Sequence, residues 1–314
     1  FIINVIFGGL VIHAWIIGGL QSILDGMNFG ERIATSNQIK WIILIDFIWI
    51  GVASLFLFRR KHYKTDLDKH YLSINRISEP KVCVIIPTYN EEDVVSKVVA
   101  DYKNQKFVTD VLVVDNHSID DTVKLARMSG ATVIEKPQNL GYGHSCYIGL
   151  KESMKNNSNV IVLTECDGTF MANDIQKMIP YLDNCDMVIG TRQVQVLTEK
   201  GNQNSMFYVW GNLLIAKLLQ LKYFSLLHMG VVNLTDVGCS YRAIRKDSLK
   251  KIIEQLESPQ SQKTIYEKKG WLFTIFLTML AISNDLKLVE IPITFKKRIG
   301  ISKSQANQKK KGLV

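Results

Sequence analysis

Acidic side chains follow three short apolar runs in the first half of the sequence. Asp115-Asn116 follows Val111–Val114, Glu165-Cys166-Asp167 follows Val160–Leu163, and Glu91 comes shortly after the earliest of the three runs. Carboxylates of this kind hydrogen-bond a base or a ribose, and they bind hard cations such as Mg²⁺ or Mn²⁺, which prefer oxygen ligands. Such a cation also neutralises a diphosphate that the acids would otherwise repel. The residue types therefore indicate a site for a nucleoside diphosphate and a divalent cation.

A simpler role for an acid at such a position is to cap the helix that follows it. This alternative applies readily to Glu91 and Asp120. It applies less well to Asp167, because Gly168 and Thr169 follow it and the next helix is expected several residues later.

The segments that must position these acids alternate between strand and helix patterns. Val111–Val114 and Val160–Leu163 have the composition of buried strands, and Glu91–Lys103 has helically spaced valines with Asn90 as its expected N-cap. This alternation predicts a parallel, doubly wound sheet with ligands at the carboxyl ends of its strands. The other predicted elements are strands at Lys81–Ile86, Thr132–Ile134 and Asp186–Ile189, and helices at Asp120–Met128, Tyr142–Met154 and about Asp174–Leu182.

Two apolar runs precede this alternating region. Phe1–Leu24 contains no charged residue, and Trp41–Phe58 contains only Asp46. Each run is long enough to cross a hydrocarbon layer of about 30 Å at about 1.5 Å per helical residue. The first run lacks the basic start and small-residue cleavage site of a signal peptide. We therefore expect the two runs to form a transmembrane hairpin. Because basic residues follow Phe58, we expect the N-terminus and the chain after Phe58 to lie on the cytoplasmic side.

Cysteine usage and charge agree with this placement. The five cysteines are widely spread and form no CxxC pair, so neither a disulfide framework nor a zinc site is expected. The formal net charge is +9, and basic residues without acids gather between Lys296 and Lys311. In a membrane protein, such a run favours anionic lipid headgroups or a phosphorylated substrate over nucleic acid.

Seven short motifs occur in order along the second region. They are IPTYNEE (86–92), VVDNHSIDDT (113–122), NLGYGHS (139–145), ECDGTF (165–170), IGTRQ (189–193), DVGCSYRAIRKD (236–247) and EIPITFKKRIGISKS (290–304). Together they resemble the family-2 glycosyltransferases, which have the GT-A fold. The resemblance is greatest to the branch of dolichyl-phosphate mannose synthases and polyprenyl-phosphate glucosyltransferases, and it extends over about Lys81–Ser304.

The apolar runs, the charge pattern and this resemblance together predict a domain order for the chain. A two-helix transmembrane hairpin (1–60, with helices at about 1–24 and 41–58) and a linker (61–80) precede the GT-A domain (81–304). That domain is Rossmann-like, with a mostly parallel sheet and helices on both faces. Membrane-interface helices are expected at about 206–234, and a basic tail at 305–314.

The resemblance also implies roles for individual residues. Pro87, Tyr89, Glu91 and Asp115 would line the base and ribose pocket of a UDP- or GDP-sugar. Asp167 would contact the metal and the diphosphate, with Glu165 beside it where the family usually has Asp. Arg192 would belong to the nucleotide-sugar site and contact a phosphate of the donor or acceptor, and the acceptor or its phosphate would meet Arg242, Arg298, Ser302 and Lys303. The catalytic group would comprise Asp167, Asp236 and Arg298. Phe276 departs from the pattern, because relatives often have Glu at that position.

The family's reaction is an inverting displacement of the nucleoside diphosphate, and the acceptor decides what Asp236 must do. A sugar hydroxyl would need Asp236 as general base, whereas a lipid phosphate is already anionic and would need Asp236 only to position or stabilise. A salt bridge to Arg242 is the structural alternative for this acid. Met206–Leu234 is rich in apolar and aromatic residues with Lys217 and Lys222, which fits helices at a membrane surface or equally helices of a core. We expect a polyprenyl phosphate acceptor.

Other classes of protein fit less well. Gly141-Tyr142-Gly143 lacks the third glycine of a dinucleotide fingerprint, because Cys146 stands there, and it does not follow the first strand. A processive polysaccharide synthase would carry a QxxRW element, which the sequence lacks. Transfer to a glycan hydroxyl and an inactive nucleotide-sugar-binding scaffold both remain open at this point.

Overall fold

The computed structural model describes residues 37–58, 74–202, 206–223, 233–258 and 270–300, with Ser261 and scattered positions between 16 and 36. The chain divides into two compact units, Phe1–Arg60 and Lys61–Val314. Most of the first predicted span, most of the linker and the whole basic tail lie outside the described residues.

The first unit contains helix α3 (Asn37–Phe58), which begins four residues before the expected start at Trp41. Large apolar side chains on it are exposed, among them Trp41, Phe47 and Ile50. Across the part of the chain that the structure describes, no helix has the length and apolar character required to cross a membrane. The predicted transmembrane hairpin therefore stays a prediction.

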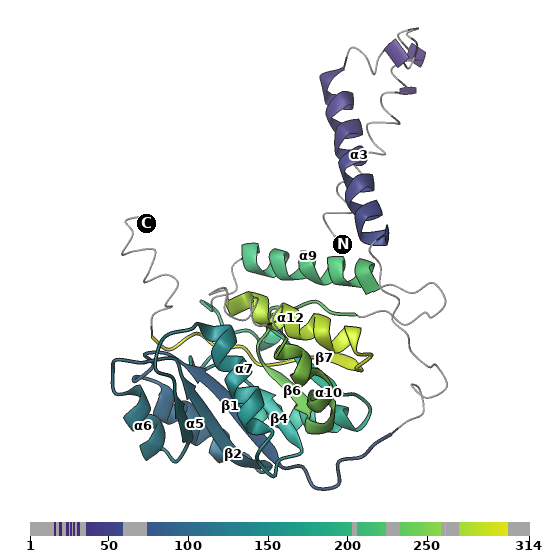
Figure 1. Cartoon of the computed structure of the whole chain (residues 1–314). Helices are drawn as coiled ribbons and strands as arrows, with labels where there is room; N and C mark the ends of the chain where they lie inside the picture. The colour runs from purple at the N-terminus through teal and green to yellow at the C-terminus, as the bar shows by residue number, and fades with distance from the viewer. Residues whose placement is uncertain are drawn as a thin grey trace. The chain divides into compact units, whose positions relative to one another are not determined.

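The second unit is built on a seven-stranded sheet with the order β3-β2-β1-β4-β6-β5-β7 (Figure 1). Strand β6 is antiparallel to both of its neighbours, and the other adjacent strands are parallel. The predicted α/β class with a mostly parallel sheet is thus confirmed. The strands are β1 (Val82–Thr88), β2 (Val108–Asp115), β3 (Thr132–Glu135), β4 (Val160–Leu163), β5 (Met187–Thr191), β6 (Arg242–Arg245) and β7 (Leu288–Pro292).

Helices cover both faces of this sheet. Helix α5 (Val95–Lys103) packs on β2 and contacts α6 (Thr122–Met128), whereas α7 (Tyr142–Ser153) packs on β1, β2 and β4. Helices α10 (Lys246–Leu256) and α12 (Gly270–Ser283) contact α7. The chain moves one way along the sheet through α5 and α6 and the other way through α7. Right-handed crossovers therefore place these two groups on opposite faces.

The prediction of one continuous helix at about Asp174–Leu182 is wrong, because the segment is divided into three short pieces. The segment forms a 3₁₀ turn (Ala172–Asp174), the four-residue helix α8 (Ile175–Met178) and a second 3₁₀ turn (Ile179–Asp183). Pro180 explains the break, because proline has no N–H to donate and its ring collides with the preceding turn of an α-helix.

Helix α9 (Met206–Tyr223) has one packed side and one exposed side. Ala216, Leu219 and Tyr223 are buried, and the Tyr223 hydroxyl lies 3.2 Å from Ser283 Oγ on α12. Met206, Tyr208, Trp210, Leu214 and Leu221 are exposed. Figure 1 shows α9 running along α12 at the rim of this unit. The helix thus joins the core along one side and presents apolar side chains along the other.

Strand register brings distant loops to one edge of the sheet. Thr88 at the end of β1 lies opposite Asp115 at the end of β2. Leu163, the last residue of β4, lies opposite Arg242, the first residue of the antiparallel β6. The loop that enters β6 therefore arrives where the parallel strands end, which is the edge at which such sheets bind ligands.

Candidate active site

Asp115 occupies the end of β2 and is 2% exposed. Its Oδ2 accepts a 3.0 Å hydrogen bond from the backbone N–H of Ser118, and its Oδ1 accepts one from the Ser118 hydroxyl. Asn116 donates through Nδ2 to Asn139 Oδ1 at 3.0 Å, which ties this loop to the turn before α7. The carboxylate is thereby held rigidly at the edge of the sheet.

The loop after β1 is joined to the loop after β2. Asn90 has a φ of 52°, a left-handed conformation that asparagine tolerates better than most residues. Its N–H donates to Ser118 Oγ at 2.8 Å, and its Oδ1 accepts from the Ile119 N–H at 3.0 Å. Glu91 donates through its backbone N–H to Thr122 Oγ1 at 2.8 Å. Pro87 is buried within β1, and Tyr89 is half-buried after it.

Arg298 connects two of the predicted site acids. Its Nη1 lies 3.0 Å from Asp167 Oδ2, and its Nη2 lies 2.6 Å from Glu91 Oε1. Asp167 Oδ1 accepts from the N–H and the hydroxyl of Thr169 at 3.1 and 2.6 Å. Arg298 Nε is buried and has no hydrogen-bond partner among the described residues. The guanidinium therefore spans the predicted ribose and diphosphate regions with one buried donor unused.

Glu165 lies between this cluster and the loop before β6. Its Oε1 accepts a 2.6 Å hydrogen bond from Ser240 Oγ. Burial, and then the charge of Asp167, raise the pKa of Glu165 to about 7, while Arg192 and Arg298 act in the opposite direction. Its ionisation therefore changes near neutral pH.

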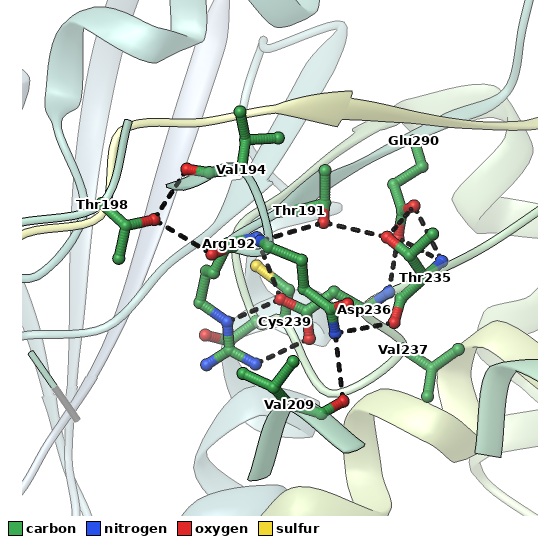
Figure 2. Close-up of polar contacts among 12 residues, drawn as sticks. Thr191, Arg192, Val194, Thr198, Val209, Thr235, Asp236, Val237, Cys239 and Glu290 are labelled. Carbon is green, nitrogen blue, oxygen red and sulfur yellow. Dashed lines mark hydrogen bonds and ion pairs between the residues drawn. The ribbon is translucent and has the colours of Figure 1, made fainter. Parts of the chain in front are cut away.

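Arg192 and Asp236 form a two-point ion pair (Figure 2). Arg192 Nε lies 2.8 Å from Asp236 Oδ2, and Nη2 lies 2.8 Å from Oδ1. The backbone N–H of Arg192 also donates to Oδ2 at 3.0 Å. The guanidinium stacks over the Phe295 ring at 5.4 Å from its centroid. Both oxygens of Asp236, which is 1% exposed, are thus engaged by one arginine.

Arg242, predicted to contact a phosphate or to brace Asp236, has no exposed surface. It donates to the carbonyls of Val237 and Cys239 at 2.9 Å and to Thr278 Oγ1 at 2.7 Å. Burial lowers its pKa to about 10. Arg242 therefore holds the backbone after Asp236 instead of pairing with its carboxylate. The Asp236–Arg242 salt bridge that was the alternative for this acid does not form, and Arg192 pairs with Asp236 instead.

Three further positions named in the sequence analysis are Ser302, Lys303 and Phe276. Ser302 and Lys303 lie outside the described residues. Phe276 is half-buried on α12 and packs against the core. Sequence reasoning missed Ser118, Thr169 and Ser240, each of which hydrogen-bonds a site acid. For the first two, a signal existed, because Asp-x-x-Ser and Asp-x-Thr spacings favour local side-chain to backbone hydrogen bonds.

The described residues contain no group of three His, Cys, Asp or Glu side chains that could hold a metal ion. Glu165 and Asp167 provide two carboxylates, and Mg²⁺ in nucleotide sites commonly uses one or two protein carboxylates with phosphate oxygens and water for the rest. This donor set therefore fits a hard cation that arrives with a diphosphate.

Comparisons with known proteins agree with this arrangement. The chain is 29% identical over 231 residues to the polyprenol monophosphomannose synthase of Mycolicibacterium smegmatis, covering 71% of this chain and 80% of that protein. It is 28% identical over 232 residues to the undecaprenyl-phosphate mannosyltransferase of Micrococcus luteus, covering 71% and 87%. It is 27% identical over 236 residues to the UDP-N-acetylglucosamine–dolichyl-phosphate N-acetylglucosaminyltransferase of Methanococcus voltae, covering 69% and 86%.

Fold and family comparisons give the assignment. The glucosyl-3-phosphoglycerate synthase of Mycobacterium tuberculosis superimposes with a TM-score of 0.51 at 14% identity, covering 73% of this chain and 74% of that one, and so shares the fold. The family model for glycosyl transferase family 2 matches residues 83–253, more than half of the chain. The chain therefore belongs to glycosyl transferase family 2 and is a glycosyltransferase.

Proposed function

We propose that this glycosyltransferase moves a sugar from a UDP- or GDP-sugar to a polyprenyl phosphate, with inversion at the anomeric carbon. The observation that carries the proposal is the Arg192–Asp236 pair, in which both carboxylate oxygens already accept hydrogen bonds. A hydroxyl acceptor requires a carboxylate oxygen able to take its proton. A phosphate acceptor carries its own charge and needs a cation beside it, which Arg192 supplies. The names of three relatives, a polyprenol monophosphomannose synthase, an undecaprenyl-phosphate mannosyltransferase and a dolichyl-phosphate N-acetylglucosaminyltransferase, support the same acceptor.

The donor would lie over the ends of β1, β2 and β4. Asp115 accepts from the Ser118 N–H, and Glu91 is held by its backbone N–H, which donates to Thr122 Oγ1, and by Arg298, which donates to its carboxylate. Both acids are thus positioned to accept hydrogen bonds from a base and a ribose. Asp167 and Arg298 would face the diphosphate. The buried, unused Nε of Arg298 suits a phosphate oxygen, because charge-assisted hydrogen bonds from guanidinium groups to phosphate are short and strong.

A divalent cation belongs to the proposal. Asp167 would hold Mg²⁺ or Mn²⁺ against the diphosphate, with Glu165 as a second ligand once it has lost its proton. When bound, the cation would stabilise negative charge on the departing nucleoside diphosphate. Arg298 and Arg192 would contribute fixed positive charge on either side of Glu165.

The transfer step itself needs little proton chemistry. An oxygen of the acceptor phosphate forms the new bond to the anomeric carbon as the bond to the nucleoside diphosphate breaks on the opposite face. Arg192 would hold the attacking phosphate, and Asp236 would keep Arg192 in place and ionised. The ion pair with Asp236 raises the pKa of Arg192 despite the opposing effect of burial.

A membrane surface would supply this acceptor. The exposed apolar side chains of α9, including Met206, Trp210 and Leu214, support contact with lipid, and those of α3 support an anchor in the first unit. Lys217 and Lys222 on α9 suit anionic headgroups. We place the catalytic unit on the cytoplasmic side, on the basis of the basic residues that follow the second apolar run.

The test uses detergent-purified protein with Mn²⁺ or Mg²⁺ and a panel of nucleotide sugars, with and without polyprenyl phosphate. We expect nucleoside diphosphate release that requires both the cation and the lipid phosphate and is lost in Asp167→Ala. Equal release with water-soluble sugar acceptors would instead make a glycan hydroxyl the acceptor. Donor-dependent thermal stabilisation without any turnover would favour an inactive nucleotide-sugar-binding scaffold.

A further inference from the structure

A carboxylate from β7 holds the backbone that presents Asp236. Glu290 lies in the middle of β7, opposite Ile189 of β5. Its Oε1 accepts from the N–H groups of Thr235 and Asp236 at 3.0 and 2.8 Å. Its Oε2 accepts from the N–H and the hydroxyl of Thr235 at 2.8 and 2.7 Å. Figure 2 shows these contacts converging on the single carboxylate.

Thr235 is held from two further directions. Its hydroxyl lies 3.0 Å from Thr191 Oγ1, and its carbonyl accepts from Gln193 Nε2 at 2.9 Å. Thr191 and Gln193 flank Arg192 in sequence. Thr235, the residue before Asp236, is thus hydrogen-bonded both to the end of strand β5, which leads into Arg192, and to strand β7, which carries Glu290.

The geometry of the Arg192–Asp236 ion pair depends on these contacts to Thr235 and to the Asp236 N–H. Two-point pairing between a guanidinium and a carboxylate requires both N–O distances to be satisfied at once, and here both are 2.8 Å. The backbone position of Asp236 decides whether its carboxylate meets the Nε–Nη2 edge of Arg192. Glu290 fixes that position through the Asp236 N–H itself.

The chemistry of the contacts requires a carboxylate. Three donor groups, two N–H and one hydroxyl, point at two acceptor oxygens. A glutamine of the same shape has one acceptor oxygen, and its amide N–H₂ would face a donor. Leaving a partly buried backbone N–H without an acceptor favours a shift of the loop that restores contact with water or another acceptor.

We propose that Glu290 is a positioning residue of the transfer reaction, acting through Asp236 to hold Arg192 against the acceptor phosphate. This rests on the proposed function, since it concerns the acceptor side of that site. Glu290 touches neither substrate nor donor in this arrangement. Its effect is on the alignment of the charged pair, and small misplacements of a binding group reduce rates strongly.

The experiment measures transfer by the full-length chain in detergent with polyprenyl phosphate, for wild type, Glu290→Gln, Asp236→Asn and the double variant. We expect Glu290→Gln to lower kcat by about 10- to 100-fold and to leave the Kd for nucleoside diphosphate with Mn²⁺ within about two-fold. Because both residues act through Arg192, the double variant should be no slower than Asp236→Asn alone. Such non-additivity is the signature of coupled residues.

Asp186→Asn provides the matched control. Asp186 lies just before β5 and accepts from the Lys287 N–H at 2.8 Å and from the Ser248 hydroxyl, so it also ties a backbone N–H next to β7 to a carboxylate. It lies at the opposite end of β5 from Arg192. We expect this variant to lower Tm but to retain wild-type kcat and to combine additively with Asp236→Asn.

The outcomes separate the two proposals. Wild-type kcat in Glu290→Gln, or an additive loss in the double variant, would overturn the positioning role while leaving the proposed function intact. A wild-type protein that is inactive with polyprenyl phosphate and every donor would overturn the proposed function, and the role of Glu290 with it. A lower Tm with unchanged kcat would assign Glu290 to stability alone.

Discussion

Arg298 lies directly against Asp167, with Nη1 3.0 Å from Oδ2. The two residues are 131 positions apart in the sequence, and the same guanidinium contacts Glu91. The acid expected to contact the cation and the acid expected to contact the donor thus share one positive charge before any substrate is bound. A diphosphate with its cation would compete for these contacts. Arg298 therefore offsets the negative charge of both Glu91 and Asp167 until the donor binds.

Replacing Arg298 should therefore impair transfer. We expect Arg298→Ala to reduce kcat/KM by about 10²- to 10³-fold, as for other groups that stabilise developing charge. Arg298→Lys should recover only part of the loss, because an ammonium cannot span Asp167 and Glu91 as a planar guanidinium does. Steady-state transfer assays measure both. Equal activity of the lysine variant and wild type would contradict the bridging role.

Glu165 should give the reaction a dependence on pH near neutrality. Its pKa is raised to about 7 by burial and by Asp167, so below that pH a cation must displace the proton of this carboxyl before the carboxylate can ligate it. We expect the apparent affinity for Mn²⁺ in the transfer assay to increase between about pH 6 and 8. Glu165→Gln should weaken the affinity and remove this rise, whereas Glu254→Gln on the exposed face of α10 should keep it. A pH-independent affinity in wild type would exclude Glu165 as a ligand.

Gly149 should be essential for packing of α7 on the sheet. A Cβ at this position would lie 2.2 Å from Ile85 Cγ2 and 3.2 Å from Val114 Cγ2, and both of these residues are fully buried. We expect Gly149→Ala to lower the free energy of unfolding by about 1–3 kcal/mol, as overpacking does. Gly211→Ala on α9 is the control, since nothing lies within 4 Å of its Cβ, and alanine should favour the helix by up to about 1 kcal/mol. Urea titrations of both variants test this, and equal midpoints would refute the clash.

His144 should make the fold sensitive to mild acid. Burial, and then the charge of Lys136, lower the pKa of His144 from 6.5 to about 4. Because the unfolded chain binds a proton at this histidine when the folded chain does not, stability falls as pH decreases from about 6.5 to about 4. Between pH 7 and 5, wild type should lose about 2 kcal/mol more than His144→Gln. Urea unfolding at both pH values measures the difference, and parallel losses would argue against a neutral buried histidine.

The parallel half of the fold could be predicted from the sequence because its signals are local. Runs of β-branched residues that end in acids gave β1, β2 and β4 within a few residues of their observed bounds. Strand β6 has no such signal, since Arg242–Arg245 contains two arginines in four residues. Its pairing comes from tertiary contact with β4 and β5. Pro180, by contrast, was a visible sign that the helix expected around it could not be continuous.

The site acids were identifiable by type, but their partners were not. Arg242, six positions after Asp236, was the alternative partner for that acid, yet the first position of β6 turns its side chain into the core. Arg192, which is 44 residues away, takes that place. Which arginine meets which acid depends on strand order and register, and neither can be read from motif spacing.

The two sides of the proposed site come from successive stretches of the chain that meet at one edge of the sheet. In the proposed function, the residues that meet the nucleotide sugar extend to Asp167 and those that meet the acceptor begin at Arg192, while Arg298 reaches the donor side from beyond β7. The two stretches meet in space because β5 runs in the same direction as β4 and ends at the same edge, where the antiparallel β6 begins. The donor-side and acceptor-side stretches can therefore diverge separately during evolution. Exchange of the stretch from Arg192 to Asp236 between relatives would alter the acceptor that is used, while the nucleotide preference would stay with the residues up to Asp167 and with Arg298.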